Sequence, residues 1–140
     1  MSYTDTFILV AADCPQETGT APPMRGDKPT VAVLEYELLS KSPYKYTHEE
    51  LLFIVHITRL GLTPDDLKQR GKQIHAELFS KPHPCMRASP LPKRYGWGVH
   101  HDGQGRIALI ARGSPEYTSL AEGKTKVGTI LKAMRSARST

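Results

Sequence analysis

The residues with the clearest capacity for chemistry lie in one segment, 93–101, which reads Lys-Arg-Tyr-Gly-Trp-Gly-Val-His-His. Alternate side chains of a strand share a face, so Gly96 and Gly98 would leave a strip of bare backbone between Arg94 and His100. Glycine inside a strand often marks close approach by a ligand or another backbone. We therefore predict that the strip floors a ligand site, with Arg94 holding an anion and His100 giving or taking a proton. A helix of the same chain pressed onto the strip, or a bend or bulge in the strand, would also explain the glycines.

The chain just before this strip adds cations and a thiol, with no acidic residue among them. Guanidinium groups suit bidentate binding of phosphate or carboxylate. A basic setting would also make Cys85 more nucleophilic, although a lone cysteine is more often a small buried apolar residue. Cys85 and His100 are therefore the candidate catalytic residues, and Tyr95 or Trp97 would stack on a ligand. The predicted ligand-binding residues are Arg87, Lys93, Arg94, Tyr95, Gly96, Trp97, Gly98 and His100.

The other reactive residues match no catalytic or metal-binding signature. Six histidines are spread along the chain without zinc-site spacing, and Cys14 and Cys85 form no C-x-x-C pair. No phosphate-binding loop, dinucleotide-binding turn or nucleophile elbow is present. The turn 43–46, Pro-Tyr-Lys-Tyr, suits either a stacked base or sugar or an anchor between two helices. We therefore predict neither a metal site nor a cofactor.

Composition places the chain among soluble globular proteins. Its 140 residues are 39% hydrophobic and 24% charged, which suits one domain spanning 1–140. The longest apolar stretch, residues 7–12, is far shorter than the about 20 residues that a membrane span requires. Residues 1–5 lack the features of a signal peptide, and two isolated cysteines fit a reducing compartment. We expect a cytoplasmic protein that does not enter a membrane.

The net charge of +5 is concentrated at the C-terminal end. Residues 124–140 contain five Lys or Arg and no Asp or Glu. Such a segment attracts acidic partners, and the attraction weakens as salt rises. The basic residues either decorate a solvated helix or bind a phosphate-bearing ligand or nucleic acid, but no nucleic-acid-binding motif accompanies them.

The order of predicted elements indicates an α+β fold with a small antiparallel sheet. A hairpin at 94–112, turning at Asp102-Gly103, joins a strand at 6–11. A turn of two or four residues would place Ala108 and Ile110 on the face of Val99. Capping boxes and apolar stripes predict the helices that cover the sheet, at 30–41, 48–58, 64–79, 115–122 and 125–137. Two segments rich in proline remain, a long loop at 13–29 and an extended linker at 81–92.

Several of these segments resemble motifs of a small family of uncharacterised bacterial and fungal proteins, filed as a domain of unknown function. The similar segments are 43–47, 85–91, 93–100 and 132–136, and the Arg-Tyr-Gly-Trp-Gly block is the most specific of them. The resemblance covers nearly the whole chain and implies no activity. A weaker likeness, in the hairpin followed by Ser-Pro-Glu and a short helix, is to small α+β domains of the MmcQ/YjbR type. Those domains are loosely associated with DNA, and a likeness of fold implies no function.

Three functional hypotheses follow. The first is a non-enzymatic intracellular domain that binds an anionic ligand, a nucleotide or a nucleic-acid phosphate. The second is a small enzyme that uses Cys85 or His100 in the glycine-floored groove. The third is an interaction module whose acidic helical half meets the basic half of a neighbour.

Overall fold

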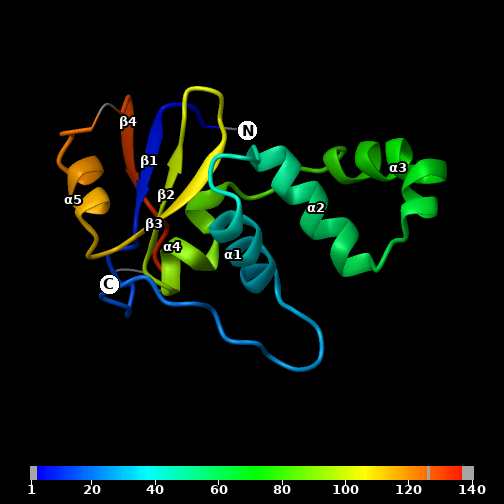
Figure 1. Cartoon of the computed structure of the whole chain (residues 1–140), viewed down its shortest axis with the longest axis horizontal. Helices are drawn as coiled ribbons and strands as arrows, with labels where there is room; N and C mark the ends of the chain where they lie inside the picture. Colours follow the sequence, from blue (N-terminus) through cyan, green and yellow to red (C-terminus); the bar gives the residue numbers. More distant parts are fainter. Residues whose placement is uncertain (1–2, 126, 137–140) are drawn as a thin grey trace.

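A central β-sheet separates one short helix from the other helices of the chain (Figure 1). The computed structural model describes residues 3–125 and 127–136. Over these residues the elements are β1 (Thr6–Leu9), α1 (Val31–Lys41), α2 (His48–Leu60), α3 (Pro64–Phe79), a 3-10 turn (Met86–Ala88), α4 (Pro90–Arg94), β2 (Trp97–His101), β3 (Ile107–Ala111), α5 (Pro115–Ala121) and β4 (Thr129–Lys132). The strand order is β3-β2-β1-β4, with α5 on one face and α1, α2 and α4 on the other (Figure 1). The predicted α+β class is confirmed.

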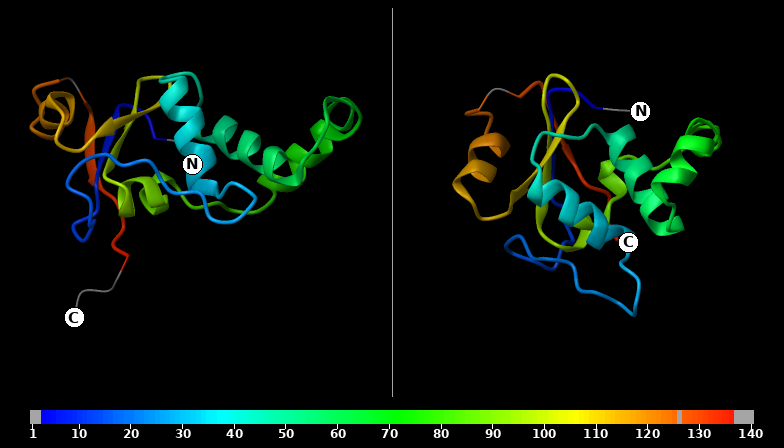
Figure 2. Two further views of the ribbon diagram at one scale, coloured as in Figure 1. Left: turned by 60° about the horizontal axis from the view of Figure 1, so that its bottom comes forward. Right: turned by 45° about the vertical axis from the view of Figure 1, so that its right-hand side comes forward.

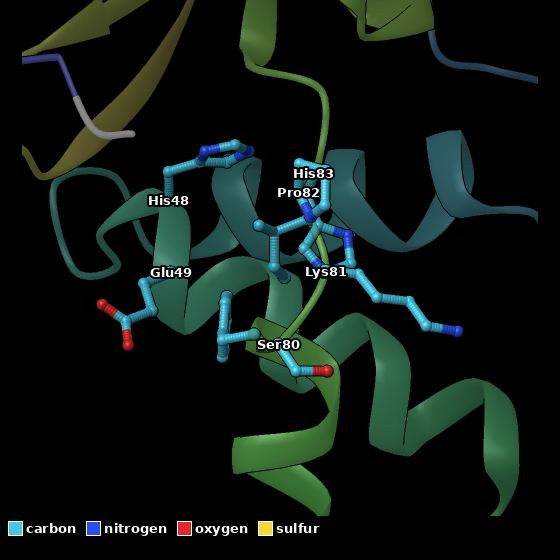
Figure 3. A pocket seen from close by; sticks show the side chains of 8 residues that line it. His48, Glu49, Ser80, Lys81, Pro82 and His83 are labelled. Atoms are coloured by element: carbon cyan, nitrogen blue, oxygen red, sulfur yellow. The ribbon is translucent and has the colours of Figure 1, made fainter.

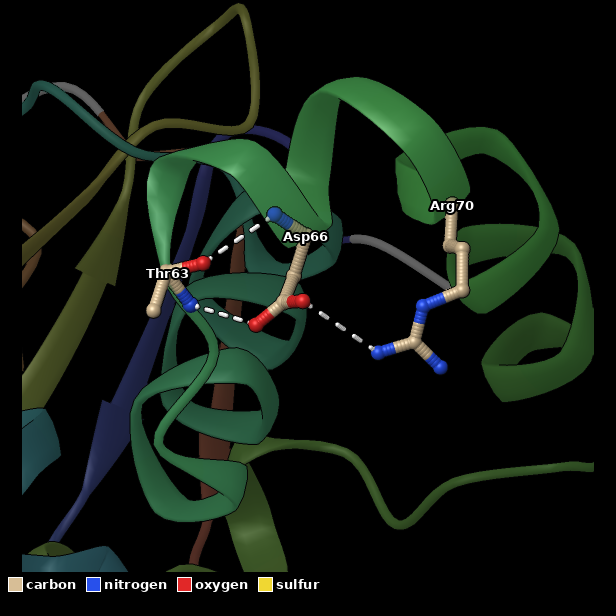
Figure 4. Close-up of polar contacts among 3 residues, drawn as sticks. All are labelled: Thr63, Asp66 and Arg70. Carbon is tan, nitrogen blue, oxygen red and sulfur yellow. Dashed lines mark hydrogen bonds and ion pairs between the residues drawn. The ribbon is translucent and has the colours of Figure 1, made fainter.

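Local capping explains why the helices begin where the sequence predicts. Thr47 accepts a hydrogen bond from the Glu50 backbone N–H, and the Glu50 carboxylate accepts one from Thr47. Thr63 and Asp66 form the same reciprocal pair at the start of α3, and Arg70 lies one turn further, 3.7 Å from the Asp66 carboxylate (Figure 4). Each box satisfies backbone donors that a helix start leaves free. The predicted helices between residues 30 and 122 are confirmed. They can be predicted from sequence because these capping signals need no distant partner.

The predicted basic C-terminal helix, 125–137, is wrong. Thr129–Lys132 instead form β4, which pairs in parallel with β1 and has its first residue opposite Thr6. A four-residue apolar run fits a strand as well as a helix, and β-branched residues favour the extended form. The free edge of β1 decides between them, because pairing satisfies its backbone groups. The sheet is therefore mixed rather than antiparallel; Lys126 and residues 137–140 lie outside the described residues.

The predicted extended linker, 81–92, is wrong in its second half. Ser89 caps α4, and Pro90 occupies the first helical position, where a missing N–H costs nothing. Proline therefore marks the start of a helix here rather than its absence. As a result Arg94 lies at the end of a helix and not in the strand with Gly98.

The hairpin register differs from the predicted one by one step. His101 pairs with Ile107, which leaves five residues in the turn. An odd number of turn residues reverses the faces that even numbers predict. Ile110, opposite Gly98, therefore lies on the glycine face, and Leu109 lies on the face of Val99.

Each face of the sheet has its own apolar core. Ile8 and Val99 belong to the larger core, beneath α1, α2 and α4. Phe7, Ile110 and Leu120 form the smaller one, beneath α5. No helix of the described chain is long and apolar enough to reach across a lipid bilayer.

Two titratable groups are buried in this fold without an opposite charge among the described contacts. Glu35 is 6% exposed and accepts a hydrogen bond of 2.8 Å from Ser89 Oγ. Burial raises its pKa from 4.5 to about 7. His101 is fully buried, and neither ring nitrogen has a hydrogen-bond partner among the described residues. Burial lowers its pKa from 6.5 to about 4, and the neighbouring His48 and His100 act in the same direction. The fold therefore favours the neutral form of both groups.

These two groups give opposite pH dependences of stability. The raised pKa of Glu35 means that its stabilising contribution is complete below pH 4.5 and is lost as pH rises through about 7. The lowered pKa of His101 means that its contribution is complete above pH 6.5 and is lost as pH falls through about 4. The contribution of each group to the free energy of unfolding is about 3 kcal/mol at most. Where the two pH dependences overlap, they have opposite signs and largely cancel.

We expect Glu35→Gln to make the chain less stable as pH falls from 6.5 to 4.5, and His101→Phe to make it more stable over the same interval. Each substitution removes one of the two titrating groups, so the pH dependence due to the other group is no longer cancelled. Urea unfolding at a series of pH values measures both. Glu37→Gln, at an exposed position of α1, is the control and should follow the wild-type curve. If the free energy of unfolding varied with pH in the same way for all variants, Glu35 and His101 would not have the shifted pKa values described above.

Candidate functional site

The predicted glycine strip is covered by the protein itself. A Cβ placed on Gly98 would lie 2.6 Å from Phe7 Cζ and 2.8 Å from Tyr117 Cε2, so two aromatic rings occupy the space that a ligand would need. Tyr117 belongs to α5, and its ring packs edge-on against Phe7 at 5.2 Å. Of the explanations open to the sequence, packing by the chain's own helix is the one observed.

The long loop, 13–29, covers the start of the same strand. Gly96 has a φ of +78° and lies against the backbone of Thr18, which leaves no room for a side chain. Thr20 donates its N–H to the Tyr95 carbonyl and accepts a hydrogen bond from Trp97 Nε1, both at 2.8 Å. Trp97 and Tyr95 are therefore held by the loop rather than presented to a ligand.

The predicted cations come from two different elements of the chain. Arg87 Nε donates to the Lys132 carbonyl at 2.7 Å, beside β4. Lys93 and Arg94 belong to α4, and Arg94 is exposed. The predicted thiol and His100 have different partners: Cys85 Sγ accepts a hydrogen bond of 3.2 Å from Tyr3 Oη, whereas His100 Nδ1 is bonded to Tyr44 Oη.

His100 is the predicted site residue that borders a cavity. Its Nδ1 lies 2.8 Å from Tyr44 Oη in a hydrogen bond, and the two rings are perpendicular. Phe7 supports the imidazole from within the sheet, edge-on at 6.3 Å. His100 is thus oriented by two aromatic rings, one from the core and one from the turn before α2.

Tyr44 is held in a backbone conformation that disfavours tyrosine. Its φ is +58°, in the left-handed region that glycine or asparagine occupies at lower cost. Two backbone hydrogen bonds of 2.9 Å attach this turn to β3, from Tyr44 N to the Ile107 carbonyl and from Ile107 N to the Tyr46 carbonyl. Strain of this kind is commonly maintained at ligand sites. The aromatic turn 43–46 was a sequence signal for Tyr44, but its contact with His100 is a tertiary one.

The cavity beside this pair has a volume of about 350 Å³. It lies between the hairpin and α5, with Ile110 and Leu120 as apolar walls. Ser119 and Thr125 share a hydrogen bond of 2.6 Å at its edge. Its lining residues are Tyr44, His100, Ile110, Pro115, Glu116, Ser119, Leu120 and Thr125. An apolar body with a few polar groups at the rim is the usual composition of a small-molecule pocket.

The electrostatics of the cavity keep its central pair neutral. Burial lowers the pKa of His100, while Asp102 and Asp5 act against that shift. Burial, Asp102 and Glu116 raise the pKa of Tyr44. A neutral imidazole bonded to a protonated phenol can both donate and accept hydrogen bonds. Among the described lining residues there is no Lys or Arg, and the charges that shift the pKa of either group are carboxylates.

A second cavity, of about 400 Å³, lies between α2 and the chain after α3 (Figure 3). His83 Nε2 is engaged with the Leu78 carbonyl at 2.6 Å. In Figure 3 the charged ends of Glu49 and Lys81 point away from one another, so they do not converge on a ligand. Across the described part of the chain, no three or more His, Cys, Asp or Glu side chains come together as metal ligands.

Comparison with known proteins identifies a matching family whose function is unknown. A family model described as "Family of unknown function (DUF6157)" matches residues 1–139. No curated protein and no solved structure matches the chain. The sequence resemblance to a family of unknown function is consistent with this match.

We expect Gly98→Ala to lower the free energy of unfolding by roughly 1–3 kcal/mol, because its Cβ would displace the rings of Phe7 and Tyr117. Gly103→Ala is the matched control, since a Cβ there meets nothing nearer than Asp5 Oδ1 at 3.4 Å. Urea unfolding of both variants measures the difference. If Gly98→Ala were as stable as the wild type, the strip would have room and the predicted ligand floor would be restored.

Proposed function

The chain belongs to the family of unknown function DUF6157, and we propose that it is a binding domain for a small amphipathic molecule with a neutral or cationic polar head. The supporting observation is the Tyr44–His100 hydrogen bond, formed by a tyrosine in a strained backbone conformation at the wall of a mostly apolar cavity. The apolar part of the ligand would lie against Ile110 and Leu120. Its polar head would meet the tyrosine–histidine pair.

The surrounding charges select the head group. Asp5, Asp102 and Glu116 act on His100 or Tyr44, and Glu116 also lines the cavity. Carboxylates attract an ammonium group and repel a carboxylate or phosphate. An amine-bearing or uncharged ligand is therefore favoured over an anion at this position.

The anionic ligand or nucleic acid remains a sequence-based prediction, because Arg87, Lys93 and Arg94 do not line this cavity. The enzyme alternative is favoured at His100 rather than Cys85. A neutral imidazole bonded to a tyrosine hydroxyl is able to relay a proton to a bound molecule. The tyrosine–histidine pair supports binding and proton exchange, and the expected cytoplasmic location is part of the same proposal.

Three probes with one apolar body and different heads test the proposal: phenethylamine, phenylethanol and phenylacetate. Titration of each, followed by NMR of the His100 imidazole, should rank their affinities in that order. Glu116→Gln should weaken phenethylamine roughly two- to fivefold, the range for a solvent-accessible ion pair, and leave phenylethanol unchanged. Tyr44→Phe should weaken all probes that bind.

Glu122→Gln is the matched control, because Glu122 is exposed next to α5, pairs with Lys124 and does not line the cavity. Equal losses with Glu116→Gln and Glu122→Gln would indicate attraction by overall charge and refute the site. Tightest binding by phenylacetate would overturn the choice of head group. No response of His100 to any probe would overturn the proposed binding function.

A further inference from the structure

A helical arm made of α2 and α3 projects from the body of the molecule, and both views of Figure 2 show α3 as its outermost part. α3 is 16 residues long, yet no residue of this described helix is fully buried. α2 buries Leu51 and Val55 in the core, while Leu60 at its far end is 56% exposed. A helix that is apolar on more than one face is normally covered on each of them. The arm therefore carries apolar side chains that its own chain covers only in part.

A groove of about 410 Å³ runs between the two helices of the arm. Phe53 comes from α2, and Leu67, Gly71, Lys72 and His75 come from α3. Glycine inside a helix is less favourable than alanine unless close packing requires it. The chain's own packing does not require it, because a Cβ on Gly71 would meet only Leu67 Cβ, at 3.9 Å.

The half-buried stripe of α3 is self-complementary about its midpoint, between Lys72 and Gln73. The half-buried residues of α3 are Asp66, Leu67, Gly71, Ile74, His75, Leu78 and Phe79, and the stripe is the four of them that are aliphatic or glycine: Leu67, Gly71, Ile74 and Leu78. If a second α3 packs against it in the opposite direction with that midpoint on a twofold axis, each Ile74 faces the Gly71 of the other copy and each Leu67 faces a Leu78. The same register places Lys68 of one copy opposite Glu77 of the other. The large side chain of Ile74 therefore packs into the space beside Gly71, and the positive charge of Lys68 faces the negative charge of Glu77.

We propose that the α2–α3 arm is the interface of a twofold homodimer, in which the α3 helices of two copies pack antiparallel through this stripe. Isologous contacts of this kind require one surface that complements itself, and the stripe meets that requirement in both size and charge. α3 lies at the opposite side of the molecule from α5, which lines the Tyr44–His100 cavity (Figure 1). It is thus independent of the proposed ligand.

Sedimentation equilibrium of the full chain over a range of concentrations tests the proposal, with a mass of twice 15.5 kDa as the expected limit. Ile74→Glu should leave a monomer at every concentration. Gln69→Glu, an exposed position of the same helix outside the stripe, is the matched control and should stay dimeric. Gly71→Ala should weaken association at least tenfold although it favours the helix itself.

If Ile74→Glu does not fold, exchanging the charges of Lys68 and Glu77 provides a second test of the interface. Lys68→Glu and Glu77→Lys should each weaken the dimer about two- to fivefold, and the double variant should restore it. A wild-type chain that is monomeric throughout, or single and double variants of equal affinity, would overturn the proposal. A monomer whose arm responds to phosphatidylcholine vesicles would assign the face to a lipid surface and overturn it as well.

Discussion

The close approach of Phe7 and Tyr117 over Gly98 is the contact on which the arrangement of the molecule depends. Because β2 has no side chain at this point, the two rings can meet at 5.2 Å and bring α5 onto the sheet. Tyr117 Oη also accepts a hydrogen bond from Val10 N, which joins α5 to the end of β1. The glycine that looks like a ligand floor in the sequence therefore serves packing, and the cavity lies beside the packed rings rather than on the strip.

The position of α5 also determines the character of the site. Leu120 and Ile110 close the smaller core, and the space left between them and His100 is mostly apolar. Burial favours the neutral forms of His100 and Tyr44, and the charges that act on their pKa values are carboxylates. A chain with a net charge of +5 thus has an acidic surrounding at its candidate site. Net charge describes the whole surface, whereas recognition depends on the local field.

The two proposed surfaces occupy opposite ends of the fold. The cavity depends on the hairpin, α5 and the turn at Tyr44, and the arm depends on α2 and α3 (Figure 1). Between them lie the sheet and the larger core, and burial shifts the pKa of Glu35 up and that of His101 down, which favours the neutral form of each. Ligand binding and association therefore rest on separate sets of contacts, and a change in one leaves the other in place.

Local signals determined α1, α2, α3 and α5. A threonine cap with its acidic partner, a proline at the first helical position and a stripe of apolar side chains act within one or two turns, so the sequence alone contains them. The α+β class followed from the order of these elements. The same reasoning failed at Thr129–Lys132, because a short apolar run adopts either form and the free edge of β1 made the choice.

The site shows the same division. His100 was found from its type and its place in a strand, and the Arg-Tyr-Gly-Trp-Gly block marked the segment around it. Its partner Tyr44 lies 56 residues away, and the five-residue turn reversed the face on which Ile110 lies. Covering of the glycine strip and assembly of the cavity both depend on contacts between distant segments. A sequence carries the residue types for such contacts, but the packing of one element against another selects which of them meet.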